Sequence, residues 1–171
     1  MAVSLPSYGA AYIRRVNVQV HYEERYWYPD DGTIVWLAGY HPVDPASGRF
    51  LARDAPQLVQ RGLRIAGVAG AARFHDEVLQ SHAAAPGRAL ALRRDPDNVH
   101  DPNAIAVLVD GGAQVGWVPR ELAADLASDL DAGRPWSTIV LRERRASPRD
   151  PRTGLTILLA PADTIELRCS A

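Results

Sequence analysis

The sequence predicts a mostly β fold with helices, of the α+β class. Short runs rich in β-branched and aromatic residues recur along the chain, and Pro, Gly, Asp and Asn separate them. Helical periodicity is confined to three stretches, 54–62, 71–85 and 120–133. The 171 residues are enough for one domain with a small appendage.

The first part, residues 1–60, is an aromatic-rich β extension, with nine of the twelve aromatic residues before position 51. The stretch 16–28 begins with alternating valines, and 33–42 is again β-branched and aromatic, so the Pro-Asp-Asp-Gly run between them predicts a β-hairpin. A turn follows at 44–48. A short helix is expected next, with Asp54 as its N-cap and Gly62 just past its end.

The second part, residues 61–171, alternates strands with two longer helices. The strands are expected at 63–69, 88–94, 104–110, 113–119, 136–146 and 155–161, with a further one at 164–169. The pair around the Asp-Gly-Gly run at 110–112 reads as a hairpin. One helix is expected over 71–85, and another follows residue 119, where Leu122, Leu126 and Leu130 form one stripe.

The composition excludes several classes of function. The net charge is −1 and all 19 basic residues are arginine, so no global basic field draws the chain to nucleic acid. The one cysteine, Cys169, rules out an internal disulfide and a cysteine zinc site. No signal peptide, membrane span or nucleotide- or metal-binding catalytic motif is visible. We therefore expect a cytoplasmic protein without a membrane partner, cofactor or enzymatic activity.

A polar cluster precedes the strand expected at 104–110. It packs five short polar side chains into nine residues: Asp95, Asp97, Asn98, Asp101 and Asn103. The carboxylates resemble part of a calcium loop, but the glycine and the closing glutamate of such a loop are missing. The cluster therefore predicts a braced turn, a ligand site, or both.

The order of this cluster, a short hairpin, "VGWVPRELA" and a leucine-striped helix ending in "LDAG" resembles the HIRAN domain family over residues 93–133. The resemblance implies a small β-barrel of OB-like or SH3-like character in the second part of the chain. It also implies single-stranded DNA as the partner, gripped at a free 3′ end, in DNA repair or replication. Such domains occur alone in many bacterial proteins.

The resemblance assigns site residues in two places. His100 and Asp101 would contact the terminal nucleotide, with Asp101 taking the 3′-hydroxyl, while Trp117 and Arg120 would help to hold the strand. A carboxylate suits a hydroxyl donor, an aromatic face stacks on bases, and a helix start favours a phosphate. The arginine and aromatic residue that family members carry after the first strand are absent, because Ala69 and Gly70 stand there.

Further arginines could line a groove for the DNA strand, together with Asn98 in the loop. They are Arg93, Arg94, Arg144 and Arg145, with Arg88, Arg142, Arg149 and Arg152 nearby.

Each assignment has a structural alternative. Asn98 could only brace the loop, Asp101 could cap a turn, and Trp117 could belong to the core. Arg120 could pair with Asp125 or Glu121, and the other arginines could be ordinary solvated side chains. The rival function is a protein-interaction module whose aromatic N-terminal hairpin is the interface.

Overall fold

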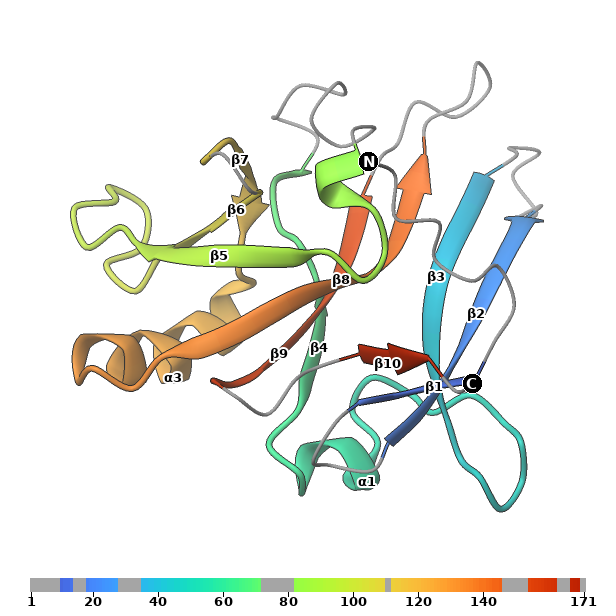
Figure 1. Cartoon of the computed structure of the whole chain (residues 1–171). Coiled ribbons are helices and arrows are strands. Elements are labelled where there is room, and N and C mark those ends of the chain that lie inside the picture. Colours follow the sequence, from blue (N-terminus) through green and yellow to red (C-terminus); the bar gives the residue numbers. More distant parts are fainter. Residues whose placement is uncertain are drawn as a thin grey trace.

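The computed structural model describes residues 10–13, 18–27, 35–71, 82–109, 112–145, 154–162 and 167–169. Within these residues the fold is mostly antiparallel β (Figure 1). The strands are β1 (Ala10–Ile13), β2 (Val18–Trp27), β3 (Val35–Val43), β4 (Arg64–Gly67), β5 (Ala89–Arg94), β6 (Ile105–Leu108), β7 (Gln114–Trp117), β8 (Trp136–Arg145), β9 (Gly154–Pro161) and β10 (Leu167–Cys169). The helical elements are α1 (Pro56–Val59), the 3-10 turn η2 (His82–Ala84) and α3 (Arg120–Asp131). This confirms the predicted α+β class.

Six of these strands form a nearly closed barrel. They pair in the order β4, β9, β8, β5, β6 and β7. The ring is completed just beyond β4, where Ala69 and Trp117 exchange two backbone hydrogen bonds of 2.8 and 2.9 Å. The barrel predicted for the second part of the chain is therefore present, and Trp117 lies at its seam.

Gly116 allows the seam to form. A Cβ atom at this position would lie 2.2 Å from Val68 Cγ1 and 2.6 Å from the Ala69 carbonyl oxygen. Any other residue would therefore push β7 away from the segment after β4. The glycine in the "VGW" motif is needed for the close backbone approach that brings Trp117 to the seam.

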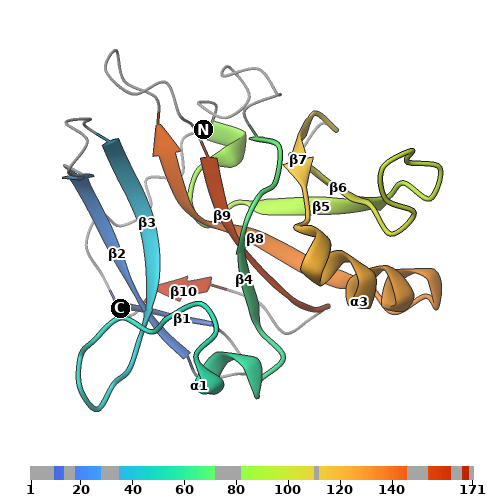
Figure 2. The same cartoon turned by 180° about the vertical axis from the view of Figure 1, so that it is seen from behind.

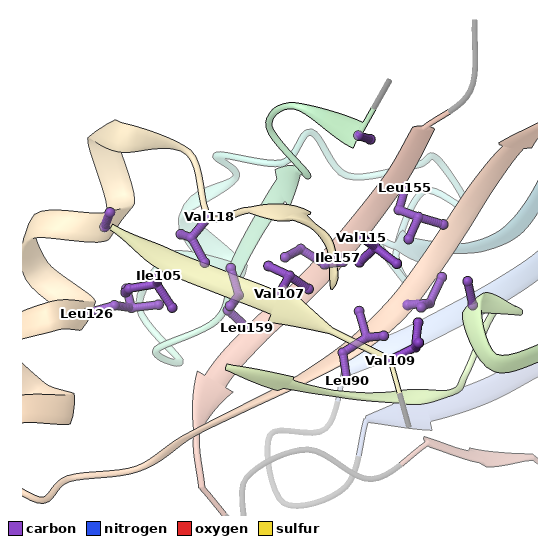
Figure 3. Close-up of a cluster of buried hydrophobic side chains, with 14 of the residues drawn as sticks. Leu90, Ile105, Val107, Val109, Val115, Val118, Leu126, Leu155, Ile157 and Leu159 are labelled. Atoms are coloured by element: carbon purple, nitrogen blue, oxygen red, sulfur yellow. The ribbon is translucent and has the colours of Figure 1, made fainter. Parts of the chain in front are cut away.

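The predicted leucine stripe of α3 packs against the barrel core. Leu126 of α3 is buried, and Leu122 and Leu130 pack partly against the same cluster. Figure 3 shows Leu126 beside Ile105 of β6, with the aliphatic side chains of β6, β7 and β9 filling the barrel interior. Gly133, with φ of +77°, follows the helix as predicted. Helix α3 therefore closes one end of the barrel.

The N-terminal strands extend the sheet beyond the barrel. The predicted hairpin strands are confirmed as β2 and β3, and β3 pairs with β8. The extension is larger than a hairpin, because β1 pairs with β2 on one side and with the C-terminal β10 on the other. Gly39 lies at the junction, where a Cβ atom would come within 2.1 Å of the Leu141 carbonyl oxygen.

A second core fills the space between the extension and the outside of the barrel. It joins Val20 and Tyr40 of the extension to Leu141 of β8 and Leu158 of β9. The neighbouring residues Val140 and Ile157 point into the barrel core instead. Strands β8 and β9 are thus buried on both faces, which explains the consecutive apolar residues at 139–141 and 157–160.

Some expectations differ from the structure or lie outside it. Asp54 is not the N-cap of α1, because Ala55 takes that position and Pro56 occupies the first helical residue, where a proline is pre-organised. Most of the helix expected at 71–85, the turn at 29–32 and the loop between β8 and β9 lie outside the described residues. Neither α1 nor α3 is long and apolar enough to cross a bilayer, and no other helix in the described part of the chain is either.

Candidate nucleic-acid interface

The polar cluster folds into a loop braced by its own side chains. Asn98 is the central brace, since its Nδ2 donates to Asp95 Oδ2 at 3.1 Å. Its Oδ1 accepts hydrogen bonds from the backbone N–H groups of His100, at 2.9 Å, and of Asp101, at 3.2 Å. Asn98 therefore has the structural role that the sequence left open, and this role orients the two residues that follow it.

The two carboxylate oxygens of Asp101 do different things. Oδ1 accepts a hydrogen bond from the Asn103 backbone N–H at 2.9 Å, which is the turn-capping role. Oδ2 lies 3.7 Å from Arg120 Nε, and the Asp101 side chain is 17% exposed. One oxygen thus stabilises the loop while the other faces a cation at the surface.

Arg120 reaches back from the first turn of α3 to this loop. Its Nη2 donates to the His100 carbonyl oxygen at 3.0 Å, and its side chain is 74% exposed. The structure therefore pairs Arg120 with the loop rather than with Glu121 or Asp125. The N-cap of α3 is Pro119, with no side-chain cap, so the helix start is open to an anion beside this guanidinium.

Trp117 is the last residue of β7 and lies at the barrel seam. It is partly exposed and is not among the residues of the barrel core. The segment after β4 passes close to its ring, since a Cβ atom on Gly70 would lie 3.4 Å from Trp117 Cδ1. Because Trp117 is only partly buried, the rest of its indole surface stays available for a ligand.

These side chains meet in one surface pocket of about 370 Å³. The described residues that line it are Ala69, Asn98, His100, Asp101, Trp117, Val118 and Arg120. An aromatic face, a carboxylate and a guanidinium thus share one hollow. The sequence indicated five of the seven lining residues as site residues. Ala69 was singled out only as a position where the family's usual side chain is absent, and Val118 was missed because an aliphatic residue gives no chemical signal.

The remaining arginines assigned from sequence do not line this pocket. Arg94 donates to the carbonyl oxygens of Ala104 and Pro102, at 2.7 and 3.0 Å, and to Asp131 Oδ1 at 2.9 Å. It thus clamps the loop to the end of α3. Arg93 is exposed and stands in register with Ala106, which in turn faces Trp117 across the sheet. Arg93 and Trp117 therefore share the outer face of the barrel.

Arg144 and Arg145 lie at the far end of β8. Arg144 lines a separate pocket, and the Arg145 side chain lies outside the described residues. Among the described residues, no three metal-binding side chains come together, and Asp95, Asp97 and Asp101 form no calcium site.

The family of this chain follows from a comparison with models of protein families. The family model of the HIRAN domain matches residues 67–159. The crystal structure of the HIRAN domain of human HLTF is 25% identical, covers 58% of this chain and 74% of that chain, and gives a TM-score of 0.46. The same human domain, solved by NMR in its DNA-bound conformation, is 24% identical with the same coverage and a TM-score of 0.37.

Two further proteins extend this comparison. A crystal structure of a protein from Lactobacillus plantarum is 24% identical, covers 56% of this chain and 91% of that chain, and has a TM-score of 0.43. A Fanconi-associated nuclease 1 homolog from Oryza sativa subsp. japonica is 44% identical over 63 residues. That match covers 34% of this chain and only 6% of the curated relative, so it concerns a small part of the nuclease homolog.

Proposed function

This chain belongs to the HIRAN domain family, and from that premise we propose that it is a DNA-binding module that takes the 3′ end of a single strand. The observation that carries the proposal is the convergence of Asp101, Trp117 and Arg120 on one pocket. They come from a loop, a strand and a helix, so no local sequence pattern requires them to meet. We expect the module to act by binding alone, in the cytoplasm, in repair or replication.

Each group in the pocket suits one part of a strand end. A base stacked on the exposed face of Trp117 would gain about 1–3 kcal/mol. The outward oxygen of Asp101 accepts a hydrogen bond from a 3′-hydroxyl and repels a phosphate at the same place. Arg120 and the open start of α3 offer a cation and backbone N–H groups to the last phosphodiester.

The segment after β4 limits how closely the pocket can enclose a bound base. Ala69 supplies neither an aromatic face nor a charge, so a base in the pocket could stack on Trp117 but not be enclosed from that side. We therefore expect an affinity that depends on Trp117 and on phosphate contacts more than on the identity of the base.

The test is a fluorescence anisotropy titration with labelled single-stranded DNA, single-stranded RNA and blunt duplex DNA of equal length. Single strands with a free 3′ end should bind best, and log affinity should fall with log salt by about 0.7 per phosphate contact. Equal binding of the blunt duplex, or no binding of any strand, would contradict the proposal.

The second candidate is a protein-interaction module, favoured by the surface of the N-terminal extension. Phe50 is 50% exposed there and stacks on His41, with ring centroids 4.4 Å apart. Exposed aromatic side chains of this kind are common interface anchors. This function would be preferred if the chain bound no nucleic acid while Phe50→Ser abolished the capture of a protein partner.

A further inference from the structure

A second hollow, of about 310 Å³, lies where the N-terminal extension meets the barrel. The extension contributes His41 of β3, which lies before the segment that matches the family. The barrel contributes Gly67, Thr156, Arg142 and Arg144 from β4, β9 and β8. The hollow therefore lies at the border between the extension and the barrel.

Arginines dominate the charge around this hollow. Arg142 is anchored, since its Nη1 donates to the Tyr40 carbonyl oxygen at 2.9 Å. Burial lowers the pKa of Arg142, and the positive charge of the nearby Arg53 lowers it further. Arg144 stands two residues along the same strand, about 6.7 Å away at the backbone. Glu143 also lines the hollow but is only 4% exposed, whereas Arg142 and Arg144 are partly exposed, so the two arginines reach solvent more than the carboxylate does.

The two hollows share a wall. Gly67 and Val68 line the second hollow, and the next residue, Ala69, lines the pocket beside Trp117. Figure 2 shows the end of β4 between β7 on one side and β8 and β9 on the other. A flexible strand that leaves the first pocket past Ala69 therefore meets the second hollow within a few nucleotides.

We propose that the hollow between β3, β4, β8 and β9 is a second subsite, which binds phosphodiester groups of the same single strand upstream of its 3′ end. This inference rests on the proposed function, because it needs the strand end to occupy the first pocket. Arg144 and Arg142 hold the phosphates through charge-assisted hydrogen bonds. The subsite borders the N-terminal extension, which contributes His41 to its lining.

Two variants probe the subsite without touching the first pocket. Gly67 stands directly opposite Thr156, which faces Arg142, so a side chain at position 67 would project into the hollow. No atom lies within 4 Å of a Cβ built on Gly67, so the backbone there accepts a side chain and Gly67→Leu should occupy the hollow. Arg144→Gln removes one charge. Arg61→Gln, at an exposed arginine that lines a different hollow, is the matched control.

The experiment compares a four-nucleotide and a twelve-nucleotide oligothymidylate, both with free 3′ ends, by fluorescence anisotropy. The wild type should bind the longer strand more tightly. Gly67→Leu should bring the ratio of the two affinities close to one, and Arg144→Gln should lower the salt slope of the longer strand by about 0.7. Both variants should bind the short strand like the wild type, and Arg61→Gln should change neither measurement.

Failure has distinct signatures. If both variants keep the wild-type ratio and slope, the second subsite does not exist, although the first pocket still binds strand ends. If a decaglutamate peptide binds through Arg144 while the longer strand gains nothing from it, the hollow takes an acidic peptide and the inference is overturned. If the wild type binds neither strand, the proposed function fails, and the inference fails with it.

Discussion

Replacing Asp101 tests the proposed grip on a 3′ end most directly. Asp101→Ala removes both the oxygen that caps the turn and the oxygen that faces the pocket. Asp101→Asn keeps an acceptor for the Asn103 backbone N–H but removes the charge. The pair of variants therefore separates the structural role of this side chain from its role in binding.

The structure sets the expected magnitudes. Loss of the single hydrogen bond to the Asn103 backbone should lower the free energy of unfolding by about 0.5–1.5 kcal/mol in Asp101→Ala, and far less in Asp101→Asn. Loss of a hydrogen bond from the 3′-hydroxyl to the carboxylate should weaken binding by roughly 1.5–3 kcal/mol, which is a factor of about 10–150. The binding loss should appear only for strands with a free 3′ end.

The assay is anisotropy with one oligonucleotide that carries either a 3′-hydroxyl or a 3′-phosphate. The wild type should disfavour the phosphate, because it would face the Asp101 carboxylate, and Asp101→Asn should partly relieve that penalty. Asp97→Ala, at an exposed carboxylate of the same loop that does not line the pocket, is the control. Equal affinity of the wild type for both ends would refute the reasoning and leave Asp101 as a turn residue.

Three further predictions concern stability. Arg94→Ala should lower the free energy of unfolding in urea by roughly 2–3 kcal/mol, because three charge-assisted contacts are lost, whereas Arg93→Ala should stay within about 0.5 kcal/mol. Gly116→Ala should lower the free energy of unfolding in urea by at least about 1–3 kcal/mol, because it opens the seam. Gly154→Ala should leave the same free energy nearly unchanged, because a Cβ atom there meets no atom within 4 Å. Hydrogen bonds from an indole and a guanidinium lower the pKa of Asp129, so the stability they give is present above about pH 4 and lost as the pH falls through that lowered value. The difference in melting temperature between the wild type and Asp129→Asn should therefore shrink in acid; a constant difference would contradict it.

Local patterns were enough to predict much of the fold. The stripe of Leu122, Leu126 and Leu130 and the turn residues between β6 and β7 are short-range signals, and both elements form as expected. The pairings of β3 with β8 and of β1 with β10 join segments about a hundred residues or more apart. No local periodicity specifies such partners, so the size of the extension could not be predicted.

The site was predictable in its residue types but not in their roles. Arg93 and Arg94 are neighbours of the same kind in the sequence, yet strand alternation exposes one and turns the other toward Asp131. Likewise, the sequence could not predict that one carboxylate oxygen of Asp101 bonds the loop while the other faces the surface. That division depends on where Arg120 lies, and α3 brings Arg120 there from 19 positions along the chain.

Strands β8 and β9 are buried on both faces, so the barrel in this chain depends on the N-terminal strands to cover its outer wall. If the family-matched residues 67–159 stood alone, Ile139, Leu141 and Leu158 would form a bare apolar strip on the outer wall. An exposed apolar strip of this kind commonly marks a site of contact with another protein. Here β2 and β3 cover it from within the same polypeptide, so the N-terminal strands act toward the barrel as a tethered partner subunit would.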